Sequence, residues 1–425
     1  MTLRIMQTIL QLSDIHFKRL PEARDEYTQL KERLYEKVEE ICKSTKVDCI
    51  LICGDVAFSG NKDEYEQKAK PFIEELQKLT GCGKGCVYMV PGNHDKNRDA
   101  GYACTREALR DAMLKDAITK DARQIEQRGY DQFFDVYKDE NNTFASWLLP
   151  FDAYIEFANE YRCLSPAVEK TRTGQDCTYS DKLYWESKEL TVGPYTLCLH
   201  GINSCYVSDW EDGNHSQILP KELYKTTRRR ATVNVSVMHH PMGFIKDGEE
   251  IEKEMDAQYP IQFYGHIHHQ TVEEKGALKI FSGAIMPPKG EGDGEDGYEP
   301  VFNVIKFEDG QGEVLVTVEP CKWVWTSKDD GWFDAEKAGE PYRVKVDSAN
   351  VADAVQEKPL KLPAGKSQRD VEIDFVQSGK MEDIMRKMYV GFELHNDPVA
   401  DASIFFGRVK QDDRYVELYN YIHEK

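Results

Sequence analysis

The sequence predicts an α/β fold in which buried strands end in polar loops, and three observations support this prediction. Six short apolar runs are each followed by a polar turn, most often with glycine: TILQLSDIH, CILICGDV, CVYMVPGNHD, TLCLHGINS, VNVSVMHHP and IQFYGHIHH. The first three runs are separated by stretches with helical spacing. After the sixth run the sequence changes to alternating apolar and polar residues, which is typical of antiparallel strands.

Helical stretches connect the first three runs, with EYTQLKERLYEKVEEICKS before the second run and EYEQKAKPFIEELQKLT before the third. This alternation of strand and helix builds right-handed βαβ units around a buried sheet. In such sheets the functional residues gather in the loops beyond the carboxyl ends of the strands. We therefore expect the six polar turns to converge on one edge of the sheet.

Two further regions of the predicted core depart from this pattern. A segment of about 100–183 contains helical stretches such as CTREALRDAMLKDA and FDAYIEFANEY, which predict a mostly helical insertion over or beside the site. After the sixth turn, KIFSGAIMPP, VFNVIKFED and EVLVTVEP predict antiparallel strands that close a second sheet. The core domain is expected to span residues 1–335.

The end of the chain predicts a small separate module. Residues 347–369 lack aromatic side chains and are rich in alanine, lysine and proline, which indicates a linker. Residues 370–425 contain the amphipathic pieces MEDIMRKMY and DDRYVELYNYIHEK. Because such short helices are too few to form a sizeable core alone, we expect the module to mediate homo-oligomerisation or the docking of a partner protein.

The composition is that of an ordinary globular protein and argues against several classes. The chain of 425 residues has 40% hydrophobic and 31% charged residues and no apolar run long enough for a membrane span. Its beginning is expected to be a first strand rather than a leader. The 11 scattered cysteines favour a reducing cytoplasm. A formal net charge of −20 disfavours extensive contact with nucleic-acid backbones but does not exclude a nuclease, because bound cations invert the local field.

The polar turns contain side chains that bind divalent metal ions. Asp14 and His16 are two residues apart at a strand end, where side chains of alternate residues lie on the same side. His266 and His268 have the same spacing, whereas His269 points the other way and is expected to be a surface residue or to support a ligand. The full candidate set comprises two carboxylates, one amide and four histidines: Asp14, His16, Asp55, Asn93, His239, His266 and His268.

This number of ligands matches two divalent ions that share one carboxylate, lying about 3.5 to 4 Å apart. A mixed nitrogen and oxygen set without thiolate suits Mn, Fe, Zn or Ni, and we favour Mn. His94 remains outside this set, although it stands next to Asn93 in the sequence.

Five of these motifs, SDIH, GDV, GNHD, MHHP and GHIH, occur in the order found in the calcineurin-like metallophosphoesterase superfamily, which the sequence resembles over roughly residues 5–320. The resemblance implies a four-layer α/β/β/α sandwich. It also implies that one ion takes Asp14, His16, Asp55 and His268, and that the other takes Asp55, Asn93, His239 and His266.

The resemblance further implies hydrolysis by a hydroxide that bridges the two ions. His94 would sit over the substrate phosphate as a proton donor or as a transition-state stabiliser. Three other residues are candidates for supporting roles. Asp95 is expected to orient His94 or to cap a helix, and His200 and His240 are expected to satisfy core hydrogen bonds or to support a ligand.

The substrate class is only partly predicted. The segments GDVAFSGNKDEY and VPGNHDKNRD look like those of bacterial members of the superfamily, and the arginine-rich signature of phosphoprotein phosphatases is absent. We expect hydrolysis of a phosphodiester in a nucleotide or a nucleic acid. The alternatives are a phosphomonoesterase or nucleotidase, and an inactive scaffold or sensor that acts through its C-terminal module.

Overall fold

The computed structural model describes most of the chain and divides it into two compact units, Met1–Ser348 and Ala349–Lys425. The described residues are 6–18, 28–98, 100, 149–161, 163, 169–170, 176–177, 185–186, 190–209, 212–219, 221–224, 226, 231–286, 299–327, 330–336, 339–346, 366–388, 398–411 and 415–423. None of the helices among them is long and apolar enough to cross a membrane.

The first unit contains two large sheets that lie face to face. The first sheet has the order β15-β14-β13-β1-β2-β3, with β16 also paired to β14. Its β1, β2 and β3 are parallel, whereas β13 to β16 are antiparallel to their neighbours. The strands are β1 (Met6–Leu12), β2 (Cys49–Ile52), β3 (Val87–Met89), β13 (Val301–Asp309), β14 (Glu313–Ser327), β15 (Asp330–Ala335) and β16 (Tyr342–Lys345).

The second sheet has the order β11-β12-β10-β9-β8-β6, with β7 also paired to β8. Its four central strands β8, β9, β10 and β12 are parallel, and they are almost entirely buried. The strands are β6 (Trp185–Glu186), β7 (Leu190–Val192), β8 (Tyr195–Ile202), β9 (Thr232–Met238), β10 (Ile261–Tyr264), β11 (Gln270–Lys275) and β12 (Ala277–Ser282); a separate hairpin joins β4 (Glu169–Lys170) and β5 (Asp176–Cys177).

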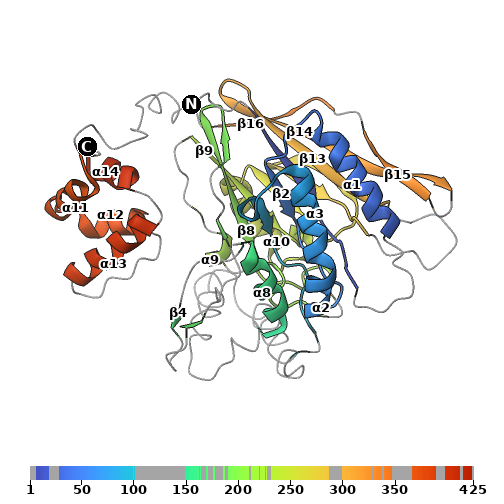
Figure 1. Ribbon diagram of the computed structural model, residues 1–425, viewed down its shortest axis with the longest axis horizontal. Helices are drawn as coiled ribbons and strands as arrows, with labels where there is room; N and C mark the ends of the chain where they lie inside the picture. The colour runs from blue at the N-terminus through green and yellow to red at the C-terminus, as the bar shows by residue number, and fades with distance from the viewer. Residues whose placement is uncertain are drawn as a thin grey trace. The chain divides into compact units, whose positions relative to one another are not determined.

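Helices cover the outer faces of both sheets. Figure 1 shows α1 and α3 side by side against the first sheet, and α1 contacts β15. The helices among the described residues of this unit are α1 (Thr28–Cys42), α2 (Lys62–Glu64), the π-helix η1 (Tyr65–Ala69), α3 (Lys70–Thr80), η2 (Lys84–Cys86), η3 (Leu149–Phe151), α8 (Asp152–Glu160), α9 (Lys221–Tyr224), η4 (Met242–Phe244) and α10 (Gly248–Gln258).

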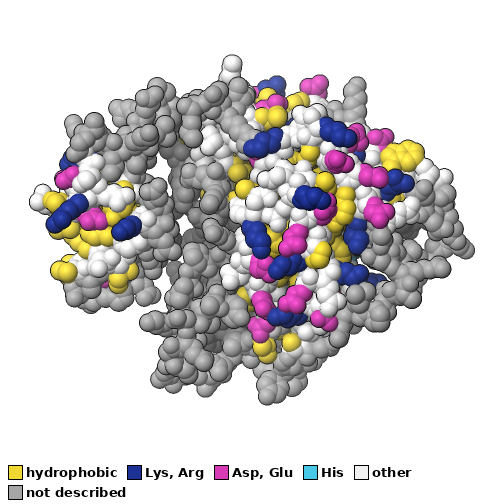
Figure 2. All heavy atoms as spheres, in the orientation of Figure 1, with side chains coloured by type: hydrophobic (Ala, Val, Ile, Leu, Met, Phe, Trp, Pro, Cys, Tyr) yellow, Lys and Arg dark blue, Asp and Glu magenta, His cyan; other side chains and the backbone are white. Residues whose placement is uncertain are grey.

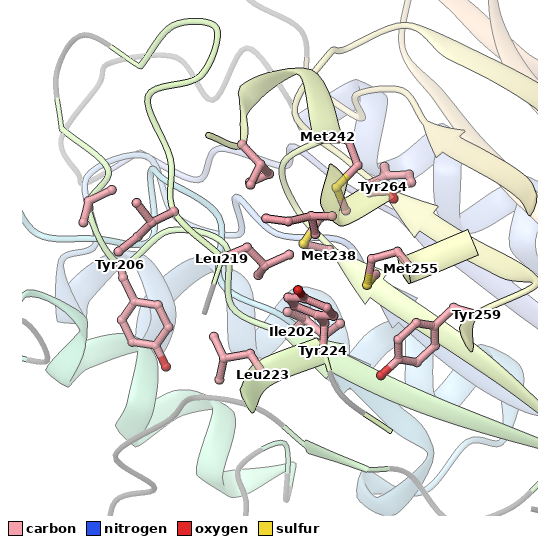
Figure 3. Close-up of a cluster of buried hydrophobic side chains, with 14 of the residues drawn as sticks. Ile202, Tyr206, Leu219, Leu223, Tyr224, Met238, Met242, Met255, Tyr259 and Tyr264 are labelled. Carbon is pink, nitrogen blue, oxygen red and sulfur yellow. The ribbon is translucent and has the colours of Figure 1, made fainter. Parts of the chain in front are cut away.

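A buried cluster joins the second sheet to α9 and α10. Figure 3 shows Ile202, Met238 and Tyr264, from the ends of β8, β9 and β10, beside Met255 of α10. These apolar contacts fix the carboxyl ends of three parallel strands. The helix and sheet layers together form an α/β/β/α sandwich, which confirms the predicted fold class.

The expected position of the late strands is wrong in one respect. KIFS belongs to β12, which runs parallel to β10 in the second sheet, but VFNVIKFED and EVLVTVEP form β13 and β14 of the first sheet. The reason is that β1 pairs with β2 on one side only, and β13 fills its other side, with Met6 opposite Glu308. These antiparallel strands therefore extend the first sheet.

Most of the predicted insertion at about 100–183 lies outside the described residues, including the helical stretch at 104–117. The stretch FDAYIEFANEY is helical, as predicted, and forms α8, whose Tyr154, Ile155 and Phe157 are buried. Lys62 and Lys70 form ion pairs with Glu156 and Glu160 of this helix. Figure 2 shows basic and acidic side chains interspersed on this face of the first unit, where such exposed pairs add little stability.

The second unit consists, in its described residues, of four helices with a core of their own. They are α11 (Gln368–Gln377), α12 (Met381–Met388), α13 (Pro398–Gln411) and α14 (Tyr415–His423). Phe375 of α11 stacks on Phe405 of α13, and both rings are fully buried. These helices therefore share a small core, whereas the sequence predicts only that they are too few for a sizeable one. The predicted linker lies largely outside the described residues.

Candidate metal centre

The loops that follow five strands bring all the predicted ligands to one place. They are the loops after β1 (Asp14 and His16), β2 (Asp55), β3 (Asn93), β9 (His239) and β10 (His266 and His268). The ligands lie beyond the carboxyl ends of parallel strands, as expected, but these strands belong to two sheets and not to one edge of a single sheet.

The ligand positions have an unusual backbone conformation. Asp14, His16, Asp55, His266 and His268 all have positive φ angles, between 51° and 71°. Strands β1 and β10 end at Leu12 and Tyr264, before these residues begin. The predicted strand alternation is therefore the wrong reason for their grouping, because left-handed loop residues turn each pair inward. Such conformations cost about 1 kcal/mol or more for non-glycine residues.

Two glycines leave room for the ligand side chains. A Cβ at Gly92 would lie 2.0 Å from Oδ1 of Asp55. A Cβ at Gly54 would lie 2.4 Å from Nδ1 of His239, and Gly54 also has a φ of +96°. Glycine is therefore required in GDV and GNHD because ligand side chains lie where a Cβ would be, and not for turn formation alone.

The first group of ligands lies around Asp14. Its Oδ1 is 3.2 Å from Nε2 of His268 and 3.8 Å from Nε2 of His16. The two imidazole nitrogens are 3.4 Å apart, and Nε2 of His16 is 3.8 Å from Oδ2 of Asp55. Asp55 thus closes this group on its inner side.

The second group shares Asp55. Oδ2 of Asp55 lies 3.4 Å from Nε2 of His239, which lies 3.0 Å from Oδ1 of Asn93. Nδ1 of His266 is 3.2 Å from that Asn93 oxygen and 3.3 Å from His239 Nε2. A single carboxylate therefore belongs to both groups.

The donor atoms present fit two divalent cations. Two ligand atoms about 2.1 Å from one ion are about 3.0 Å apart at a right angle and about 3.4 Å apart at a tetrahedral angle. The spacing of the nitrogens and oxygens in both groups falls close to this range. Asp14 and Asp55 are completely or almost completely buried, at 0% and 1% exposure, so their charges require compensation. The metal-capable groups among the described residues contain no cysteine.

The two carboxylates remain charged because imidazoles face them. Burial alone would raise the pKa of Asp55, but the charge and hydrogen bond of His239 outweigh it and lower the pKa well below its usual value. The same competition lowers the pKa of Asp14, with His268 as the main partner. Burial lowers the pKa of His16 to about 4 and that of His266 to about 3, so both imidazoles are neutral, as metal ligands must be.

His239 predicts a pH dependence of metal binding. Burial lowers its pKa, but Asp55 outweighs burial and raises the pKa to about 9. An ion must therefore displace a proton from His239 at neutral pH, and we expect its affinity to rise about tenfold per pH unit between about pH 7 and 9. Calorimetric titration with Mn²⁺ in buffers of different ionisation enthalpy measures both the affinity and the proton release.

The ion-free protein provides the control for this prediction. Because the folded pKa of His239 exceeds its unfolded value of about 6.5, the pair with Asp55 stabilises the fold fully below that pH. This contribution is lost as the pH rises through about 9, so metal affinity should increase while ion-free stability decreases. An affinity independent of pH over this interval, without proton release, would contradict the protonated pair.

His94 lies at the edge of the centre and is partly exposed. Its backbone N–H donates to Oδ1 of Asp55 at 2.8 Å, and its Nδ1 lies 2.7 Å from the carbonyl oxygen of Phe58. Its ring meets the ring of His16 edge to face at 4.7 Å. Because Nδ1 is engaged, Nε2 is the nitrogen left to act on a substrate. His94 also belongs to a metal-capable group with His16 and Asp55, so its predicted place outside the ligand set stays a prediction.

Asp95 has a different contact set from the one expected. Its carboxylate instead accepts hydrogen bonds from the backbone of Val56, Ala57 and Gly92 and from the hydroxyl of Tyr65, at 2.8 to 3.2 Å. It thereby fastens the loop after β2 to the loop after β3. Burial, followed by the nearby charge of Asp55, raises the pKa of Asp95 to about 6.

The remaining histidine candidates differ in their distance from the centre. His240 is buried between His239 and His266, and its Nδ1 lies 3.0 Å from Oγ of Ser204. His200 lies within β8 and pairs with the side chain of Asn234 at 3.3 Å, which makes it a core residue. His269 is exposed and belongs to none of the metal-capable groups.

Sequence reasoning missed two neighbours of the centre, Ser204 and Phe58. Ser204 lies in the GINS turn, and its hydroxyl bonds both the ring and the backbone of His240. Phe58 holds His94 through a backbone carbonyl, for which a sequence carries no residue-specific signal. Its ring is 40% exposed, lies 5.3 Å from the His94 ring, and has the ammonium of Lys18 over it at 4.8 Å.

Comparisons with known proteins identify a family and one relative in sequence. A family model described as calcineurin-like phosphoesterase matches residues 7–270. An uncharacterized metallophosphoesterase-like protein of Bacillus subtilis, YydB, is 25% identical over 360 residues, which cover 78% of this chain and 62% of that protein. The chain thus spans less than two thirds of the length of this relative.

Two solved structures are also similar to the chain. A purple acid phosphatase from yellow lupin seeds, PPD1, covers 82% of this chain and 55% of its own, with 11% identity and a TM-score of 0.41. Vps29 of Chaetomium thermophilum covers 81% of this chain and 100% of its own, with 8% identity and a TM-score of 0.34.

Proposed function

Because the chain belongs to the calcineurin-like phosphoesterase family, we propose that it hydrolyses phosphodiester bonds in a nucleotide or a nucleic acid, using two divalent metal ions with Mn²⁺ favoured. The observation that carries this proposal is the pair of ligand groups that share Asp55, with His94 at their edge. All the ligand types that the proposal requires are present and lie close together. The inactive-scaffold alternative predicts the loss of one or more of them.

The bound ions would supply a water of lowered pKa as the nucleophile and would neutralise charge on the phosphoryl oxygens. The chain itself would hold one ion through Asp14, His16, Asp55 and His268, and the other through Asp55, Asn93, His239 and His266. The left-handed loops and the close glycine contacts fix these side chains before any substrate arrives, so little reorganisation is required on binding.

His94 would act on the leaving group. When the bond between phosphorus and the leaving oxygen breaks, the imidazolium form of His94 gives its Nε2 proton to that oxygen and keeps the Nδ1 proton that it donates to the carbonyl of Phe58. General-acid assistance of this kind contributes about 10²- to 10⁴-fold to a rate. The partial exposure of His94 is compatible with direct contact to a substrate at the edge of the centre.

The charge balance supports a diester rather than a monoester. A phosphodiester carries one negative charge at neutral pH, whereas a phosphomonoester carries nearly two. The formal net charge of −20 repels the more highly charged substrate more strongly. We therefore favour diester hydrolysis, and a small diester satisfies this condition better than a nucleic-acid strand, which carries a charge on every phosphate.

The test compares initial rates of the Mn²⁺-loaded protein on bis-p-nitrophenyl phosphate and on p-nitrophenyl phosphate. Faster cleavage of the diester is expected, and competition by cyclic dinucleotides or by single-stranded DNA would then distinguish the two substrate classes. Preference for the monoester would instead indicate a phosphatase or nucleotidase. The absence of turnover on either compound, with both ions bound, would favour the scaffold.

We also propose that the C-terminal unit is an interaction module in a protein of a reducing compartment. Ile373 and Val376, one turn apart on α11, are 46% and 53% exposed, and Val399 of α13 is 79% exposed. Exposed apolar groups of this kind are typical of contact surfaces.

Replacing Ile373 and Val376 together by glutamate is expected to lower the mass in solution, measured by light scattering, or to abolish partner capture. The described cysteines are all free thiols, which supports the proposal of a reducing compartment.

A further inference from the structure

A backbone carbonyl contributes to the orientation of His94, together with the rings of His16 and Phe58. Nδ1 of His94 lies 2.7 Å from the oxygen of Phe58, which is 36 residues earlier in the chain. This bond selects which ring nitrogen faces the centre and fixes the plane of the ring. The position of residue 58 therefore determines where the proton donor points.

A buried carboxylate holds the loop that contains Phe58. Oε2 of Glu64 accepts hydrogen bonds from the backbone N–H groups of Ser59 and Asn61, both at 3.0 Å. Glu64 is only 1% exposed, so these charge-assisted bonds are shielded from water. On the other side, the N–H of Phe58 donates to the carbonyl of Phe17 at 3.0 Å.

The same loop packs directly on the segment that follows His94. Gly60 has a φ of +64°, and a Cβ at this position would lie 2.6 Å from the backbone nitrogen of Asn97. The side-chain amide of Asn97 also lies 3.4 Å from Oδ1 of Asn61. The 58–61 loop is thus held by Phe17 on one side and by Asn97 on the other. We therefore expect a shift of Ser59 or Asn61 to move the carbonyl of Phe58, to which His94 is bonded.

We propose that Glu64 is a positioning residue for leaving-group protonation. It holds the 58–61 loop so that the carbonyl of Phe58 keeps Nε2 of His94 directed at the leaving oxygen. This inference rests on the proposed function, because it concerns the proton donor of that reaction. Through its bonds to Ser59 and Asn61, Glu64 would act on catalysis by way of the Phe58 carbonyl and His94.

The leaving group provides a readout that a general loss of structure would not reproduce. Phenolate, with a conjugate-acid pKa of about 10, departs poorly without protonation. p-Nitrophenol is far more acidic than phenol, so its anion departs with much less need for protonation. Methyl phenyl phosphate and methyl p-nitrophenyl phosphate therefore form a matched pair of diesters. For Glu64→Ala we expect kcat/KM to fall by about 10- to 100-fold on the phenyl diester and by at most about threefold on the p-nitrophenyl diester.

Three further variants sharpen the experiment. Glu64→Gln retains an acceptor oxygen and should restore most of the activity on the phenyl diester. His94→Ala should show the same selective loss as Glu64→Ala, and the double variant should be no slower than His94→Ala alone. In the C-terminal unit, Asp370 accepts from the backbone N–H of Ser367 at 2.8 Å in the same manner, so Asp370→Ala is the matched control and should leave both rates unchanged.

Several outcomes would overturn the inference. Equal losses of kcat/KM on both diesters would mean that Glu64 supports the fold or the metal centre in general. A double variant clearly slower than His94→Ala would mean that Glu64 acts by another route. If Glu64→Ala does not fold, Glu64→Asp takes its place, because the shorter side chain withdraws the carboxylate while retaining its charge. A wild-type protein that cleaves neither diester would overturn the proposed function as well.

Discussion

Replacing Asp55 by alanine is expected to abolish metal-dependent hydrolysis and to prevent the stable binding of both ions. Asp55 is the one carboxylate that belongs to both ligand groups, and it lies 3.4 Å from Nε2 of His239 and 3.8 Å from Nε2 of His16. Its removal also leaves His239 without the carboxylate that raises its pKa. We expect the rate on bis-p-nitrophenyl phosphate to fall by more than about 10³-fold.

Metal analysis by mass spectrometry and initial rates would measure both effects. Asp48→Ala is a suitable control, because Asp48 precedes the same strand that Asp55 follows and its carboxylate accepts from the backbone of Thr8 at 3.0 Å. That variant should lose stability but retain two ions per chain. Two tightly bound ions in Asp55→Ala, with an unchanged rate, would disprove the shared-ligand arrangement.

Replacing His94 by alanine is expected to lower the turnover of methyl phenyl phosphate, whose leaving group needs a proton, by about 10²- to 10⁴-fold while both ions stay bound. The physical reason is that His94 would give a proton to the leaving oxygen, and the ligand groups remain complete without it. His269→Ala is the control, since that histidine is exposed and belongs to none of the metal-capable groups.

The metal content of the His94 variant decides between two roles. Because His94 lies within reach of an ion shared with His16 and Asp55, loss of an ion on its removal would identify it as a ligand. Retention of both ions with a slow rate would support the proton-donor role. Retention of both ions with a normal rate would remove His94 from the reaction altogether.

The general position of the centre could be predicted from the sequence because it depends on a short-range rule. Each ligand follows an apolar run, and runs of parallel strands end at one edge of a sheet. Asp14 and Asp55 are brought together in this way because β1 and β2 are neighbouring strands, whereas His239 follows β9 of the second sheet, and strand order within one sheet does not predict its approach. The predicted fold class is correct for the same reason, since alternating strands and helices leave few arrangements.

The details of the loops could not be predicted, because they depend on contacts between distant backbones. No residue pattern distinguishes a left-handed His268 from an extended one, so strand alternation was a reasonable but wrong explanation. The pairing of β13 with β1 joins residues about 300 positions apart, and nothing local indicates it. The role of Glu64 is hidden for a similar reason, because its partners are backbone groups that every residue possesses.

The left-handed ligand residues also place thermal stability and metal binding in opposition. At Asp14, Asp55 and His268, glycine would relieve the local torsional penalty, so a screen for heat resistance alone would favour replacements that empty the centre. The protein keeps a strained backbone conformation at the positions where it needs carboxylate or imidazole side chains. Attempts to raise the heat resistance of this protein should therefore leave the five left-handed ligand positions untouched and direct stabilising substitutions to helix surfaces and helix ends; the five are Asp14, His16, Asp55, His266 and His268.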